Sequence, residues 1–100
     1  MESRHFFIAG AQYHELPKVV ADIKEGETLD LVSEPTNKYD PNAIRIERDG
    51  LFLGYVPKRF SSEIAGLGEI IPLSCIVELV DAKARPWEMC KVVIKEKEEK

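Results

Sequence analysis

The sequence has little that would support metal binding or a membrane span. Its 100 residues include two cysteines and two histidines, and these do not show the spacing of a metal site. The longest apolar runs are only a few residues, which is too short for a transmembrane helix or a signal peptide. We therefore expect a cytoplasmic protein that does not contact membranes and that needs no metal or cofactor.

Motifs typical of enzymes are also missing. Ser61 and Ser62 lack the context of a nucleophile elbow, and no Gly-rich phosphate loop follows a strand and opens a helix. Cys75 and Cys90 lie in apolar segments, which favours buried thiols in a reducing compartment over a disulfide. These absences predict a protein that is not an enzyme.

The charge balance is acidic, with a net charge of −4. This balance argues against a broad surface that coats nucleic acid. The distribution is uneven, because residues 34–60 carry five cations and four anions, a net +1 that leaves −5 on the remainder. The chain length predicts one domain, residues 1–95, followed by a charged, solvated tail at residues 96–100.

Alternating and β-branched segments predict about six short strands. The clearest pair is Ile44–Arg48 and Leu51–Val56, joined by the tight turn Asp49-Gly50. Ser61 or Ser62 is expected to cap a short helix that runs to Leu67. The other predicted strands are Phe6–Ala9, Val19–Ile23, Thr28–Glu34, Leu73–Val80 and Met89–Ile94. Such a set predicts a mainly β protein, a small and partly closed antiparallel barrel with one or two short helices.

One segment, Glu34–Ile44, contains two prolines, two asparagines and an aspartate. These residues exclude regular helix and predict a compact loop that is held by its own hydrogen bonds. The loop exposes Tyr39 beside Asp40, and an exposed aromatic ring on an ordered loop indicates binding. A structural interpretation is equally open, in which Asn37, Asp40 and Asn42 only tie the turn together.

A second binding signal comes from aromatic residues near cations. Single-stranded nucleic acid binds to surfaces on which bases stack on aromatic rings, each worth ~1–3 kcal/mol, while cations contact phosphates. The alternative for each tyrosine is a half-buried core ring with its hydroxyl in water. The residues concerned are three tyrosines at or after turn segments and two following cations, Tyr13, Tyr39, Tyr55, Lys58 and Arg59.

Three blocks of the sequence resemble the HIRAN domain in residue type and in spacing. They are Phe7–His14, Leu29–Ile44 and Leu53–Pro57, and the middle block carries the specific pattern Glu-Pro-x-Asn-x-Tyr-Asp-x-Asn-Ala-Ile. The resemblance runs from about Arg4 to Ile94 and is that of a HIRAN domain standing alone. It implies a modified oligonucleotide-binding barrel, in agreement with the predicted strands.

The resemblance also implies a ligand, the 3′ end of single-stranded DNA. By position, Tyr13 and Tyr39 match aromatics that sandwich the terminal bases, and Asp40 matches a carboxylate that accepts a bond from the free 3′ hydroxyl. Lys58 matches a cation that contacts phosphate. Gln12 departs from the well-studied eukaryotic domains, which have an arginine there. The full predicted DNA-binding set is Gln12, Tyr13, Asn37, Tyr39, Asp40, Tyr55, Lys58 and Arg59.

The sequence therefore predicts a non-enzymatic module that binds single-stranded DNA 3′ ends, or damaged or fork DNA, in DNA repair or replication-fork processing. Repair or replication proteins are the expected partners. The acidic charge motivates an alternative, a protein-interaction module that keeps the barrel without binding DNA. A third interpretation, an accessory part of a hydrolase or nuclease, rests on the helicase and nuclease fusions of the family.

Overall fold

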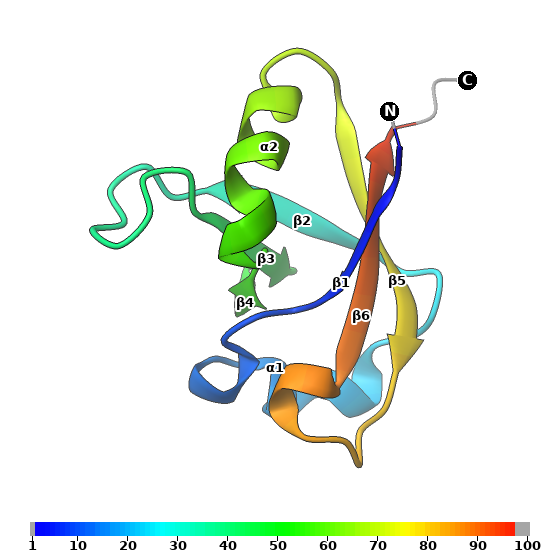
Figure 1. Cartoon of the computed structure of the whole chain (residues 1–100). Helices are drawn as coiled ribbons and strands as arrows, with labels where there is room; N and C mark the ends of the chain where they lie inside the picture. Colours follow the sequence, from blue (N-terminus) through cyan, green and yellow to red (C-terminus); the bar gives the residue numbers. More distant parts are fainter. Residues whose placement is uncertain (1, 98–100) are drawn as a thin grey trace.

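Six antiparallel strands form one strongly curled sheet in the computed structural model, which describes residues 2–97 (Figure 1). Along the sheet the order is β1-β6-β5-β2-β3-β4. The strands are β1 (Arg4–Phe7), β2 (Thr28–Ser33), β3 (Ile44–Arg48), β4 (Leu51–Tyr55), β5 (Leu73–Val80) and β6 (Cys90–Glu96). The prediction of a small, partly closed antiparallel barrel is confirmed.

The two ends of the sheet meet just beyond β1. Ala9 and Tyr55 form an isolated antiparallel bridge, in which each backbone N–H donates to the other residue's carbonyl over 2.8 Å. Gly54 makes this approach possible, because a Cβ there would lie 2.5 Å from Ile8 Cγ2 and 2.6 Å from the Ala9 carbonyl oxygen. The bridge brings the segment after β1 against β4, far away in the sequence.

The core lies inside the curled sheet and follows the strand alternation. In β3 and β6, for example, Ile46, Val92 and Ile94 are fully buried. Cys75 and Cys90 are buried free thiols, as the sequence predicts. Burial raises the pKa of both thiols, that of Cys90 to about 12, so both remain protonated and unreactive near neutral pH.

The prediction of a strand at Val19–Ile23 is wrong. The chain forms the short helix α1 (Leu16–Val19) and then a 3₁₀ turn, Val20–Asp22. The buried residues Leu16, Val20 and Ile23 are spaced by four and three, which is the spacing of a helical face. Pro17 lies in the first turn of α1, where a missing N–H has no cost.

The second helix, α2 (Lys58–Gly68), begins earlier than the sequence predicts. Pro57 is its N-cap residue, and no side chain caps the helix. Ser61 is not a cap, because it lies one turn inside the helix and is only 2% exposed. The predicted cap is therefore wrong. The Ser61 hydroxyl lies 3.0 Å from the Lys58 carbonyl oxygen of its own helix and 2.6 Å from Asp40 Oδ2.

The remaining connections follow the sequence closely. The hairpin between β3 and β4 turns at Asp49 and Gly50, which have φ angles of 50° and 82°, as a type I′ turn requires. Glu96 is the last residue of β6, the Lys97 N–H donates to the Pro72 carbonyl, and residues 98–100 of the predicted tail lie outside the described residues. No helix in residues 2–97 is long and apolar enough to cross a membrane.

Replacing Gly54 by alanine should destabilise the protein, because the new methyl group would press on Ile8 and on the Ala9 carbonyl. We expect the free energy of unfolding to fall by about 1–3 kcal/mol, as for other overpacked sites. Gly66→Ala in α2 is the matched control, since nothing lies within 4 Å of its added Cβ. Urea denaturation of both variants measures the difference, and equal stabilities would contradict the proposed role of the bridge.

Candidate functional site

A cavity of about 280 Å³ opens where the bridged end of the sheet faces the Glu34–Ile44 loop. Ala9 and Gly10 form one side, and Gly10 adopts a left-handed φ of 67° that turns the chain into the 3₁₀ turn Ala11–Tyr13. The loop and the start of α2 form the other side. The full lining is Ala9, Gly10, Asn37, Tyr39, Asp40, Ala43, Tyr55, Val56 and Lys58.

Asn37 holds the loop in shape with both ends of its side-chain amide. Its Oδ1 accepts from the backbone N–H groups of Tyr39, at 2.9 Å, and Asp40, at 3.0 Å. Its Nδ2 donates to Glu34 Oε1 at 2.8 Å and to the Tyr55 hydroxyl oxygen at 3.4 Å. The amide thus ties the tip of the loop to its base and to β4, as the structural interpretation of this residue predicts.

The Tyr55 hydroxyl completes this network from the sheet. It donates to Glu34 Oε1 over 2.7 Å, and Arg45 Nη1 lies 3.6 Å from Glu34 Oε2. The hydrogen bonds from Tyr55 and Asn37, with the nearby Arg45 charge, lower the pKa of Glu34 below its usual range. Burial and the Glu34 carboxylate raise the pKa of Tyr55. Glu34 is therefore a charged anchor and Tyr55 a neutral donor near neutral pH.

Asp40 is bonded through both carboxylate oxygens. Oδ1 accepts from the Asn42 N–H at 2.9 Å, and Oδ2 accepts from the Ser61 hydroxyl at 2.6 Å. The Ser61 bond, the Asn42 N–H and the charge of Lys58 lower the pKa of Asp40. A carboxylate has about four lone-pair positions, so each oxygen can still accept a further donor. Asp40 is thus fixed in orientation, ionised and still able to accept a hydrogen bond.

Two of the three tyrosines expose their rings to solvent. Tyr13 is 79% exposed and Tyr39 is 81% exposed, so neither ring belongs to the core. The ammonium of Lys38 lies 5.9 Å from the centroid of the Tyr39 ring, and Lys58 Nζ lies 3.4 Å from the Tyr39 carbonyl oxygen. Tyr39 therefore combines a free aromatic face with two neighbouring cations, the combination that stacked bases and phosphates require.

A stack of planar groups supports the sheet beside Tyr55. His14 lies parallel to Phe52 with centroids 3.9 Å apart, and the Arg45 guanidinium carbon is also 3.9 Å from the Phe52 centroid. Two groups this close to one ring must occupy opposite faces. Burial and the charge of Arg45 lower the pKa of His14, which is neutral at pH 7. The Tyr55 ring meets Phe52 edge to face at 5.0 Å, so this stack holds it in place.

Most of the residues predicted from the sequence meet at the cavity. Asn37, Tyr39, Asp40, Tyr55 and Lys58 line it. Gln12 and Tyr13 lie in the 3₁₀ turn directly after Gly10 and are exposed, but they do not line it. Arg59 also does not line it, and its guanidinium carbon lies 4.7 Å from the centroid of the Phe60 ring.

Sequence reasoning missed the two supporting groups Ser61 and Glu34. The sequence predicts Ser61 as a helix cap, whereas its hydroxyl bonds to Asp40, 21 residues away in the sequence. Glu34 does open the loop pattern Glu-Pro-x-Asn-x-Tyr-Asp, but nothing local indicates that its carboxylate accepts a hydrogen bond from Tyr55.

The family model for the HIRAN domain matches residues 1–86. The chain belongs to the HIRAN family. Two solved structures share its fold. The crystal structure of the HIRAN domain of human HLTF is 19% identical, with a TM-score of 0.74 over 92% of this chain and 72% of that one. A protein from Lactobacillus plantarum is 20% identical, with a TM-score of 0.76 over 93% of this chain and 95% of that one. No curated protein sequence matches.

Membership confirms the resemblance that the three sequence blocks carry. A HIRAN domain is a binding module and is not itself catalytic, and the family supports DNA binding in general. Within residues 2–97 no three His, Cys, Asp or Glu side chains are placed to hold a metal ion.

Ser61→Ala should raise the pKa of Asp40 toward its ordinary value of 3.8, because the variant removes the largest cause of the lowered pKa. Since the pKa of Asp40 is lowered on folding, the stability that Ser61 contributes is present above pH 3.8 and is lost as the pH falls through the folded pKa. Carbon-13 NMR of the Asp40 carboxyl measures the pKa. The control is Ser62→Ala at the exposed neighbouring position. If the pKa of Asp40 is the same in both variants, Ser61 does not lower it.

Proposed function

We propose that the domain binds the 3′ end of single-stranded DNA in the cavity between the bridged sheet edge and the Glu34–Ile44 loop. One observation carries the proposal. An ionised, oriented Asp40 lies next to the exposed Tyr39 ring at a cavity that Lys58 also lines. These three groups offer an acceptor, a stacking face and a cation within one small space. The human HLTF structure of this fold is a HIRAN domain as well.

The acceptor character of Asp40 favours a strand end over a continuous strand. A free 3′ hydroxyl is a donor, and an ionised carboxylate only accepts. Ser61 and Asn42 hold the carboxylate in place, so binding does not have to order it first. In this proposal Asn37 and Tyr55 act by holding the loop, since their hydrogen bonds are made within the protein.

The stacking face and the cations account for sequence-independent affinity. Tyr39 and Tyr13 would receive the terminal bases, with Gln12 beside them as a neutral polar contact. Lys58, Lys38 and Arg59 would contact phosphates. The cations are few and the net charge is −4, so binding is confined to a short stretch at the end of a strand. Such a module would place repair or replication proteins at strand ends, damaged sites or forks.

Binding should favour a 3′ hydroxyl over a 3′ phosphate by roughly tenfold or more. The phosphate loses a hydrogen bond to a charged acceptor, worth about 1.5–3 kcal/mol, and opposes the Asp40 charge. Asp40→Asn should shrink this preference, because an amide does not repel the phosphate. Fluorescence anisotropy with short labelled oligonucleotides at low salt measures both affinities.

Tyr39→Ala tests the contribution of base stacking to affinity separately from recognition of the 3′ hydroxyl by Asp40. It should weaken binding of both ends alike, by ~1–3 kcal/mol, since the ring carries a base and not the hydroxyl. Thermal unfolding of each variant shows whether the fold persists. Equal affinity of well-folded protein for the two ends, with an unchanged ratio in Asp40→Asn, would rule out end capture.

Lys58→Ala should reduce affinity for all DNA sequences alike. It should also make the plot of log binding constant against log salt concentration less steep, by the amount that one phosphate contact contributes. Lys83→Ala is the matched control, because Lys83 is exposed in the β5–β6 connection and does not line the cavity. A salt titration of both variants decides the matter. If the slopes of the two variants are the same, Lys58 is not a phosphate ligand.

A further inference from the structure

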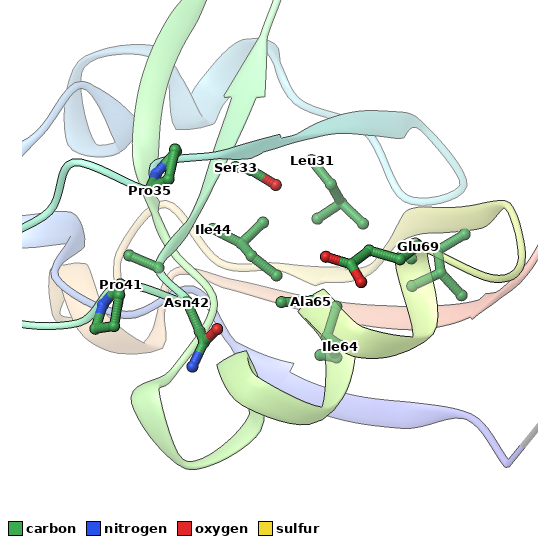
Figure 2. A pocket seen from close by; sticks show the side chains of 12 residues that line it. Leu31, Ser33, Pro35, Pro41, Asn42, Ile44, Ile64, Ala65 and Glu69 are labelled. Atoms are coloured by element: carbon green, nitrogen blue, oxygen red, sulfur yellow. The ribbon is translucent and has the colours of Figure 1, made fainter.

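A second and larger cleft, of about 380 Å³, lies between α2 and the inner face of β2 and β3 (Figure 2). Most of its lining residues are apolar, although polar atoms make up much of the exposed lining, and Leu31, Ile44 and Ala65 project into it from three different elements. The Glu69 carboxylate at the end of α2 points into the same space (Figure 2). The remaining lining residues are Ser33, Pro35, Pro41, Asn42, Ala43, Ile64, Gly68 and Leu73.

One side of this cleft is an open strand edge. The Glu34 N–H donates to the Ala43 carbonyl and Val32 pairs with Arg45, so the even-numbered residues of β2 direct their backbone groups toward β3. The backbone N–H and C=O of Leu31 and Ser33 therefore point the other way, toward β5. Pairing of β2 with β5 ends at Leu29 and Cys75, so within residues 2–97 these groups have no strand partner.

The strand opposite is open as well. If the β2–β5 register continued, Leu31 would pair with Leu73, and both residues line the cleft instead. The Lys97 N–H bonds to the Pro72 carbonyl, so the backbone groups of Leu73 also face away from β6 and into the gap. In Figure 1, β2 (cyan) runs away from β5 (yellow) toward the Glu34–Ile44 loop.

The charge of the cleft differs from that of the DNA-binding cavity. None of its lining residues is Lys, Arg or His, and the charged one is Glu69. No described residue pairs with the Glu69 carboxylate. The single charge of such a lining repels phosphates. The unpaired backbone groups of Leu31 and Ser33 can form a ladder with a partner that carries regularly spaced N–H and C=O groups. An extended peptide supplies those groups, and nucleic acid does not.

We propose that this cleft binds an extended peptide segment of a partner protein, which adds to the β2 edge as a strand. The backbone of the peptide pairs with Leu31 and Ser33. One aliphatic side chain of the peptide packs against Leu31, Ile44 and Ala65, and a neighbouring Lys or Arg of the peptide forms an ion pair with Glu69. This interaction does not depend on DNA binding, although Ala43 lines both sites and the Glu34–Ile44 loop separates them.

The test is a selection from a phage-displayed random heptapeptide library on the purified protein, followed by affinity measurements on the enriched peptides. We expect peptides with an aliphatic residue close to a Lys or Arg. Ser33→Pro removes the N–H that faces the gap and keeps the pairing of Val32 with β3, so affinity should fall about tenfold or more. Ser33→Ala retains the N–H and should bind normally.

Charge reversal at Glu69 tests the proposed contact between its carboxylate and a Lys or Arg of the peptide. Glu69→Lys should shift the selected peptides from cationic to acidic, whereas Glu25→Lys, the same change at an exposed turn outside the cleft, should leave the selection unchanged. If Ser33→Pro fails to fold, Ala65→Met fills the cleft from α2, and the same loss of affinity is expected.

Amide hydrogen exchange measures directly whether the backbone N–H groups of the β2 edge are hydrogen-bonded. In the free protein, Leu31 and Ser33 should exchange faster than Val32 and Glu34, and an enriched peptide should protect them. Three results would overturn the proposal. They are a library without enriched binders, equal affinity of the peptides for Ser33→Pro and Ser33→Ala, and protection that grows with protein concentration alone. The last result would assign the edge to a second copy of this chain.

Discussion

The close approach of Gly54 to the Ala9 backbone is the contact on which the rest of the site depends. It lets Ala9 and Tyr55 exchange two hydrogen bonds and join the ends of a six-stranded sheet. Together with the stacking of His14 on Phe52, it places Gly10 and the turn that carries Tyr13 opposite the Glu34–Ile44 loop. The cavity is therefore a product of barrel closure, because its two sides come from segments that no local interaction connects.

The loop shows how structure and binding can use the same residues. Asn37 and Asp40 satisfy backbone groups of the loop, as residues in a self-bonded turn do. These bonds hold the backbone at Tyr39, whose ring is exposed to solvent, while the Ser61 hydroxyl and the Asn42 N–H lower the pKa of Asp40 beside it. The structural and the functional interpretation of this segment are compatible, since a ring and an acceptor held in advance lose little entropy when a ligand binds.

Two sites of opposite character flank this loop. The cavity on one side has Lys58 and an oriented carboxylate, and the cleft on the other has an open strand edge and Glu69. The acidic balance of the whole chain thus does not describe either site, because local charge decides which ligand each can accept. The two proposed sites together would let one small domain join a strand end to a protein segment.

The sequence by itself determined the elements whose signals are local. The alternation in Ile44–Arg48 and the Asp49-Gly50 turn specify a hairpin, and the Glu34–Ile44 pattern specifies both the loop and the family. Tertiary structure decided the rest. The segment Val19–Ile23 became helical because Val20 and Ile23 pack into a core formed by distant strands. Ser61 supports Asp40, and the β2 edge stays open, because these features depend on how α2 and β5 lie against β2, which no local pattern encodes.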